Sequence, residues 1–169
     1  HRVAESAARR DVMAGPAQRH GARQLIEQDR QQRDAEAGLE GAANAAALAR
    51  RNSDCEVWQQ DFLRLELPAA RFDGVFANAS LFHVPGQALP GVLRALHATL
   101  KAGGVLFSSN PRGENQEGWR DARYGAYHDL ETWRRYLDDA GFVELEHYYR
   151  PPGLPREQQP WLASVWRRM

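Results

Sequence analysis

The chain has 169 residues, with 22 basic and 22 acidic side chains and a formal net charge of zero. Without an excess of positive charge there is no long-range field to attract phosphate backbones or anionic lipid, which argues against nucleic-acid and membrane partners. The single cysteine, Cys55, cannot close an internal disulfide or build a thiolate zinc site unaided. No apolar run approaches the roughly 20 residues that cross a bilayer, and no signal-like apolar core follows the first residues. These features predict a cytoplasmic protein without a metal site.

The large aromatic side chains are unevenly distributed along the chain. All sixteen of them lie at or after Trp58, so the first third lacks the side chains that usually dominate core burial. Residues 1–37 are rich in Arg, Gln and Ala and carry no sustained apolar stripe. We therefore expect an atypical helical or disordered segment over residues 1–37 and a regular domain over residues 38–169.

Strands and helices alternate from Gly38 onward. Leucines at helical spacing indicate a helix that ends before Gly103-Gly104, and Asp129 and Gly141 are suited to cap the next helix at its two ends. In chain order, we expect a strand tail at 38–41, a helix over 42–51, strands over 56–60 and 72–77, a helix from 89 to 100, a strand over 105–109, a helix over 130–140, and strands over 142–149 and 161–166.

The order of these elements predicts the fold class. The stretch 72–109 has the pattern of a strand–helix–strand unit, which places two parallel strands side by side. The last two strands follow each other through a proline-rich loop, as expected for an antiparallel pair at a sheet edge. The sequence predicts an α/β, Rossmann-like fold with a mostly parallel sheet, helices on both faces and an antiparallel C-terminal strand pair.

Residues 38–169 resemble the later part of class I S-adenosylmethionine-dependent methyltransferases of the small-molecule type. The resemblance lies in the order and spacing of short segments, each unspecific alone: Gly38-Leu39-Glu40, Gln60-Asp61-Phe62, Leu67-Pro68 to Phe72-Asp73-Gly74-Val75, Leu81-Phe82-His83-Val84, Leu100 to Leu106 with Lys101-Ala102-Gly103-Gly104, and Ala140-Gly141-Phe142. The resemblance implies S-adenosylmethionine as the cofactor and a small molecule as the methyl acceptor.

The same resemblance assigns cofactor roles to residues at strand ends. Glu40 matches the acid that accepts hydrogen bonds from the ribose hydroxyls, although an acid near a helix N-terminus is also favoured by the helix dipole. Asp61 matches the acid that receives the adenine amino group, with Phe62 contacting the base, although aspartate is also a common cap of turns. Asn78 and Ser80 match the loop that lines the methionine end of the cofactor and the substrate. The alternative is that they are simply polar residues at the end of a strand.

Two histidines are candidates for a base. His83 follows the strand over 72–77 closely and could deprotonate the acceptor, although a histidine in an apolar run is more often structural. His128, beside Tyr124 and Tyr127, is the second candidate.

The polar stretch from Asn110 to Arg120 is predicted to be a substrate lid. It follows a strand and would overhang the same sheet edge. Arg112 or Arg120 could hold an acidic substrate there, and Tyr127 is a further candidate substrate contact. The alternative is a solvated surface loop.

One feature of the family is missing. Class I methyltransferases open with a strand and an acidic-x-Gly-x-Gly loop, whose glycines let the backbone approach the cofactor, whereas this chain has no Gly-x-Gly sequence. A fragment, or a reading-frame shift upstream of Gly38, would account for this. We therefore keep two alternatives to an active methyltransferase: an inactive, methyltransferase-derived binding module, and a different nucleotide-binding domain such as an NAD-dependent oxidoreductase, which also requires a glycine fingerprint.

Overall fold

The computed structural model describes residues 41–121 and 123–169. The chain divides into two compact units, residues 1–59 and 60–169. The predicted segment 1–37 and the strand tail before residue 41, including Glu40, lie outside the described residues. The predicted boundary near Gly38 therefore stays a prediction.

The first unit contains a helix over residues 41–52, as the alanine-rich sequence predicts. The strand predicted over 56–60 is wrong, because these residues form no regular structure. Their polar groups are engaged locally instead. The Arg50 side chain donates to the carbonyl of Val57 at 3.1 Å, and in the second unit the Gln60 side chain hydrogen-bonds both the backbone N–H and the carbonyl of Glu66.

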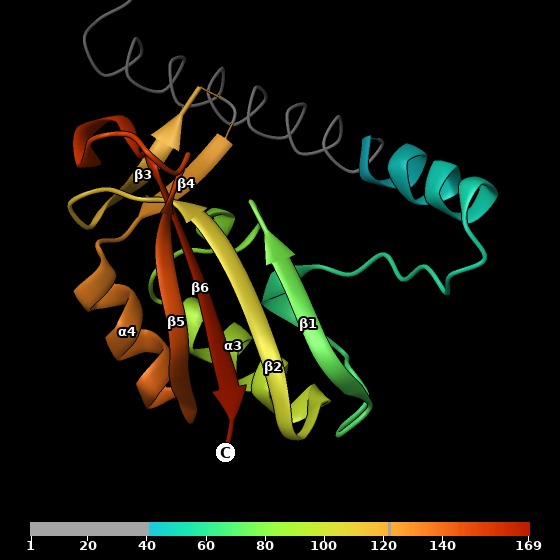
Figure 1. Cartoon of the computed structure of the whole chain (residues 1–169). Coiled ribbons are helices and arrows are strands. Elements are labelled where there is room, and N and C mark those ends of the chain that lie inside the picture. Colours follow the sequence, from blue (N-terminus) through green and yellow to red (C-terminus); the bar gives the residue numbers. More distant parts are fainter. Residues whose placement is uncertain (1–40, 122) are drawn as a thin grey trace, which may run out of the picture. The chain divides into compact units, whose positions relative to one another are not determined.

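A four-stranded mixed sheet forms the second unit (Figure 1). Its order is β1 (Phe72–Asn78), β2 (Leu100–Pro111), β6 (Trp161–Arg168) and β5 (Phe142–Arg150). β1 and β2 are parallel, while β6 runs antiparallel to both β2 and β5. The antiparallel C-terminal pair is therefore confirmed, and so is the α/β, Rossmann-like fold. Within the described residues only β1 and β2 are parallel to each other, so the parallel part of the sheet is smaller than the sequence suggests.

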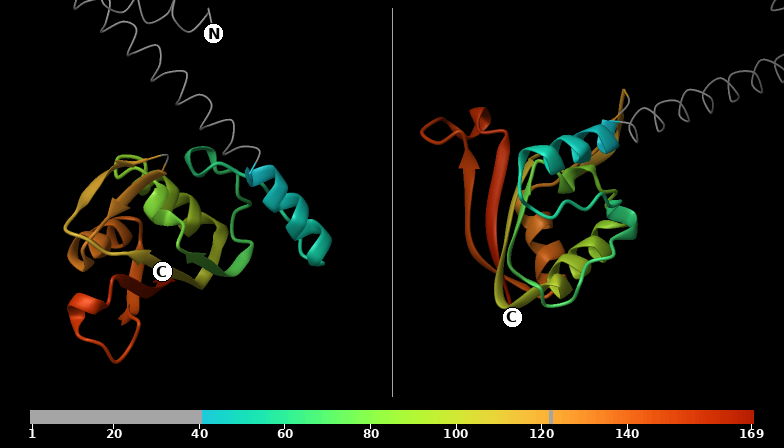
Figure 2. Two further views of the ribbon diagram at one scale, coloured as in Figure 1. Left: turned by 90° about the horizontal axis from the view of Figure 1, so that it is seen from above. Right: turned by 90° about the vertical axis from the view of Figure 1, so that its right-hand side faces the viewer.

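Two helices cover one face of this sheet. They are α3 (Leu89–Thr99) and α4 (Leu130–Asp139), and both lie on the same side (Figure 2). The carboxylate of Asp129 accepts a hydrogen bond from the backbone N–H of Thr132 at 2.8 Å, which confirms the predicted cap of α4. Leu100, predicted to end the helix over 89–100, instead begins β2. Among the described residues of the second unit, no helix covers the opposite face.

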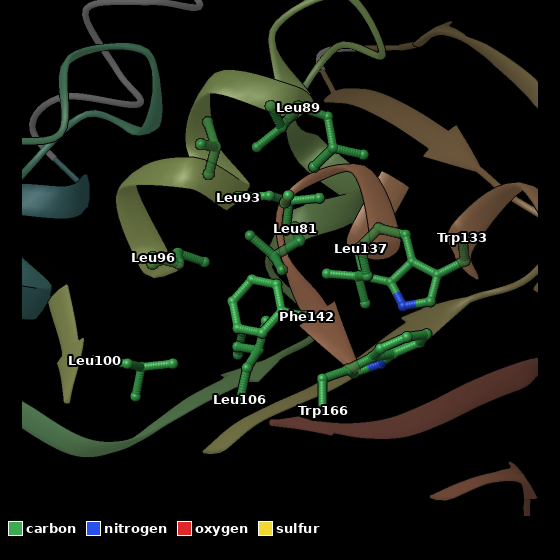
Figure 3. Close-up of a cluster of buried hydrophobic side chains, with 14 of the residues drawn as sticks. Leu81, Leu89, Leu93, Leu96, Leu100, Leu106, Trp133, Leu137, Phe142 and Trp166 are labelled. Atoms are coloured by element: carbon green, nitrogen blue, oxygen red, sulfur yellow. The ribbon is translucent and has the colours of Figure 1, made fainter. Parts of the chain in front are cut away.

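The hydrophobic core fills the space between the helices and the sheet (Figure 3). It joins one face of each helix to the inward side chains of all four strands, and its fully buried members include Leu81, Leu89, Leu93, Leu100, Leu106, Leu137 and Trp166. On the opposite face, Phe76 is 75% exposed and stacks on Phe107 with 4.7 Å between ring centroids.

The predicted lid between β2 and α4 is a hairpin, not an irregular loop. β3 (Gln116–Arg120) pairs antiparallel with β4 (Arg123–Tyr127) as a separate two-stranded sheet. Neither strand is predicted from the sequence, because Gln116–Arg120 is mostly polar and lacks the alternation that marks a half-buried strand.

Ser164 offers a direct test of the polar bonds inside the core. Its hydroxyl lies 2.9 Å from the Ser108 hydroxyl and accepts from Trp133 Nε1 at 3.2 Å. Ser164→Ala leaves both partners buried and unbonded, so we expect the free energy of unfolding to fall by about 1–3 kcal/mol in urea titrations. Ser109→Ala is the matched control, because its buried hydroxyl has no hydrogen-bond partner. Equal losses in the two variants would contradict a role for these bonds in stability.

An ion pair between α4 and β5 makes stability depend on pH. The Arg134 guanidinium donates to the Glu144 carboxylate at 2.5 and 3.0 Å, and His147 Nδ1 lies 2.6 Å from the same carboxylate. The hydrogen bond from Arg134 lowers the pKa of Glu144 below its usual value near 4.5, against the effect of partial burial. The folded state therefore gains stability above the ordinary pKa and loses it as pH falls through the lowered one.

We expect Glu144→Gln to lower the free energy of unfolding by about 1 kcal/mol at pH 7. The difference from the original chain should shrink as the pH falls through the lowered pKa of Glu144, because both side chains are neutral below it. Asp73→Asn, which breaks the exposed ion pair with Lys101, is the control and should have a smaller effect. A difference in the free energy of unfolding that persists unchanged at low pH would rule out the ion pair as its cause.

Candidate active site at the carboxyl ends of β1 and β2

The parallel strands β1 and β2 end at the same edge of the sheet. Asn78, the last residue of β1, is paired with Ser109 of β2. Ala79 then adopts a left-handed backbone conformation with φ 53°, and its N–H donates to the Ser109 carbonyl at 2.8 Å. A residue with a Cβ takes up this conformation at a cost of about 1 kcal/mol, and such strain is concentrated at functional loops. The turn sends the chain across the strand ends.

A short 3-10 helix, η2 (Leu81–His83), follows this turn. Its first residue, Leu81, is buried in the core, whereas His83 is exposed. The Ser80 hydroxyl precedes η2 and makes no capping bond to it. His83 Nδ1 lies 2.7 Å from the backbone carbonyl of Tyr124. Since a carbonyl only accepts, Nδ1 carries the proton, and in the neutral ring Nε2 keeps a lone pair.

The β3–β4 hairpin is attached to the loop after η2. The Glu117 carboxylate accepts from the N–H of Gly86 at 2.7 Å, and the bond from His83 to Tyr124 forms a second attachment to the hairpin. Burial, together with the neighbouring Glu117, raises the pKa of the Tyr124 hydroxyl, which is therefore a neutral donor near pH 7. These contacts hold the hairpin beside the strand ends.

A small cavity lies among the hairpin, β2, η2, α4 and β6. Its volume of about 10 Å³ is close to that needed by one water-sized group. The His128 ring lies nearly parallel to Trp133, with 6.3 Å between centroids, and tilted against Tyr136 at 5.1 Å. The lining residues are Phe82, Asn110, Pro111, Ala126, His128, Trp133 and Leu162.

Four of the predicted site residues lie along these elements. Asn78 and Ser80 flank the Ala79 turn, and His83 follows within η2. Tyr127, in β4, has its ring 6.0 Å from that of Phe82 and under the Arg120 guanidinium at 4.8 Å. The structure thus connects Asn78, Ser80 and His83 through one short stretch of chain, and Tyr127 through the neighbouring hairpin.

Asp61 and Phe62 make structural contacts beside α3. The Asp61 carboxylate accepts from the N–H of Leu63 at 2.9 Å and so caps η1 (Phe62–Arg64). This contact is the turn-capping alternative that the sequence also allowed. Phe62 packs against the core and lines a groove with residues of α3. Their cofactor roles stay predictions, as does that of Glu40, which lies outside the described residues.

Arg112 anchors the loop between β5 and β6. Its guanidinium donates to the carbonyls of Gln159 at 2.8 Å and Arg156 at 2.6 Å. These bonds engage the groups that would hold an acidic substrate, so the predicted substrate role of Arg112 stays a prediction without geometric support.

Asn110 and Glu117 lie in the stretch that the sequence predicts as a lid, but neither was assigned a role of its own. Asn110 continues β2 beyond the buried Ser108 and Ser109, and a polar residue at a strand exit was the one available signal. Glu117 had none, because its partner Gly86 is remote in sequence.

Membrane spans and metal clusters are both absent from the described residues. Among residues 41–121 and 123–169, no helix has both the length and the apolar character needed to cross a membrane. In the same part of the chain, no group of three or more His, Cys, Asp or Glu side chains is arranged to hold a metal ion.

Known structures share this fold. A methyltransferase from Mesorhizobium loti, described as S-adenosylmethionine-dependent, is 18% identical with a TM-score of 0.59, over 72% of this chain and 74% of that one. The 1,6-didemethyltoxoflavin-N1-methyltransferase of Burkholderia thailandensis, bound to its substrate and S-adenosylhomocysteine, is 23% identical with a TM-score of 0.60, over 73% of this chain and 56% of that one. The [4+2]-cyclase SpnF is 16% identical with a TM-score of 0.57, over 75% of this chain and 62% of that one.

The sequence itself also identifies the family. None of the curated proteins compared with the chain matches it. The family model described as a methyltransferase domain matches residues 18–104, more than half of the chain. That match begins within the segment 1–37 and continues through β1 and α3 into β2. The chain therefore belongs to the methyltransferase domain family, the class I methyltransferases whose cofactor is S-adenosylmethionine.

Proposed function

We propose that this chain transfers a methyl group from S-adenosylmethionine to a small-molecule acceptor by direct displacement, at the carboxyl ends of β1 and β2. The observation that supports this most is the Ala79 turn, which sets Asn78, Ser80 and His83 on one short stretch at the sheet edge. The family implies the reaction, and ligands of open α/β sheets bind at this edge.

The residues at this edge fit the reacting end of the cofactor. The Asn78 amide offers both donors and an acceptor, and the Ser80 hydroxyl is not used as a helix cap. Asp61 and Phe62 for the adenine, and Glu40 for the ribose, remain the residues that the family resemblance suggests. The cofactor supplies a methyl group on a positively charged sulfur, which is already activated for transfer.

Because the leaving group is activated, the task of the protein is mainly alignment of the acceptor with the methyl group. His83 is the candidate base for an acceptor that must lose a proton. Its Nδ1–H is fixed on the Tyr124 carbonyl, so Nε2 is the atom that would take the proton. The hairpin that supplies Tyr124 therefore also positions the ring.

A catalytically inactive binding module is the second candidate. The absence of a Gly-x-Gly sequence favours it, because the loop that normally approaches the cofactor closely has no counterpart in this sequence. The fold itself is compatible with other activities, as the [4+2]-cyclase shows. A chain that binds the cofactor weakly and transfers methyl groups slowly would be intermediate between the active enzyme and the inactive module.

Isothermal titration with S-adenosylmethionine separates these candidates. We expect saturable micromolar binding, and Asn78→Ala should weaken it by about tenfold, since about 1.4 kcal/mol is typical of a lost hydrogen bond to a bound ligand. Asn52→Ala, on an exposed position of the first unit, is the control and should bind as the original chain does. A folded sample that gives no binding heat would favour the inactive module.

His83→Gln tests the base. Glutamine can still donate to the Tyr124 carbonyl but cannot accept a proton near neutral pH, so kcat should fall by about 10²–10⁴ with little change in KM. His97→Gln on α3 is the matched control. An unchanged kcat in His83→Gln, measured with a panel of hydroxyl and amine acceptors, would remove His83 from the mechanism.

A further inference from the structure

The cavity beside the strand ends contains buried polar atoms that the protein leaves without partners. Asn110 is only 8% exposed, and its side-chain oxygen makes no hydrogen bond. Both ring nitrogens of His128 are buried and are also unpaired. An unsatisfied buried polar group costs about 1–3 kcal/mol, and such groups are rare in folded proteins. Since both residues line the same cavity, one group bound there can bond to the Asn110 oxygen and to one ring nitrogen of His128.

The other residues that line the cavity limit which kind of ligand can carry the bound group. They are apolar, and three of them, Phe82, Trp133 and Pro111, have ring side chains. The volume of about 10 Å³ admits one small functional group and not a whole substrate. The rest of the ligand must therefore lie outside the cavity.

The cavity also carries no counter-charge for an ion. Burial lowers the pKa of His128 in spite of the raising effects of Glu117 and Asp129, so its ring is neutral near pH 7. The Asp129 carboxylate is bonded to Thr132 and Asn115, and Glu117 is bonded to Gly86. A carboxylate would face the unpaired Asn110 oxygen with no proton to donate, whereas a hydroxyl or N–H group can donate to it.

We propose that Asn110 and His128 form a polar subsite for an uncharged hydroxyl or NH2 group of the acceptor. A hydroxyl would donate to the Asn110 oxygen and accept from the protonated ring nitrogen of His128, whereas an NH2 group would donate to the Asn110 oxygen and to the unprotonated ring nitrogen. The identification of the ligand as the methyl acceptor rests on the proposed function; the subsite itself rests on the unpaired atoms. The proposal replaces an acidic substrate held by Arg112 with a neutral one.

Phenol is a suitable probe, because it carries one hydroxyl on a flat apolar ring. We would follow the His128 ring nitrogens by NMR in protein labelled with ¹⁵N-histidine during titration with phenol, toluene and benzoate. Phenol should shift the His128 signals saturably, with a Kd at least about tenfold lower than those of toluene and benzoate, as expected for a hydrogen bond of about 1.4 kcal/mol. Benzoate binding as tightly as phenol, or no phenol response at His128, would overturn the proposal.

Matched variants localise the effect. His128→Phe keeps a flat ring against Trp133 and removes both nitrogens, and Asn110→Leu removes the acceptor at similar size. Each substitution should weaken phenol binding by about tenfold. Because His128→Phe removes the histidine nitrogens, phenol binding to that variant is followed through the Trp133 indole signal. His97→Phe is the control, because this partly buried histidine packs on Phe142 in a different part of the core. Thermal melts verify that all variants are folded, and equal phenol binding by Asn110→Leu and the original chain would contradict the subsite.

The same samples are titrated with S-adenosylmethionine, so that the two proposals fail separately. Phenol binding without cofactor binding would support the subsite and contradict the methyl-transfer function. Cofactor binding without a phenol response at His128 would support the function and contradict the subsite.

Discussion

The parallel pairing of β1 and β2 is the constraint on which the rest of the site depends. Because the two strands run in the same direction, Asn78 and Ser109 reach the same edge. The bond from the Ala79 N–H to the Ser109 carbonyl then fixes the turn, and the buried Leu81 anchors the chain beyond it. Every site residue from Ser80 to His83 takes its position from this pairing.

The site is completed by contacts that are remote in sequence. His83 reaches the Tyr124 carbonyl, and Gly86 is bonded to Glu117, so the hairpin and the loop after η2 hold each other. Asn110, near the end of β2, and His128, which precedes the Asp129 cap of α4, both line the cavity. Alignment of an acceptor over the strand ends therefore depends on β3 and β4 as much as on the main sheet.

The sequence predicted the elements whose signals are local and missed those that depend on a partner. Asp129 caps α4 through a bond three residues away, so its role was visible in the sequence. The strand expected over 56–60 needed a neighbouring strand, which a single sequence does not reveal, and Gln60 instead closes a turn with Glu66. β3 was missed because its mostly polar residues do not alternate with apolar ones, and β4, its partner in the two-stranded sheet, was missed with it. The position of Asn78 and Ser80 at the exit of β1 could be predicted, because a polar exit from an apolar strand is a local pattern, whereas the bond of Glu117 to Gly86 could not.

The central claim is that the edge formed by Asn78, Ala79 and Ser80 receives the reacting end of the cofactor. A crystal structure of the chain with S-adenosylhomocysteine tests it most directly, because the demethylated sulfur marks where the methyl group is transferred. The account predicts that the sulfur lies against residues 78–80, on the side of the strand ends that faces His83 and the cavity. A bound nucleoside whose sulfur lies away from this edge would contradict it.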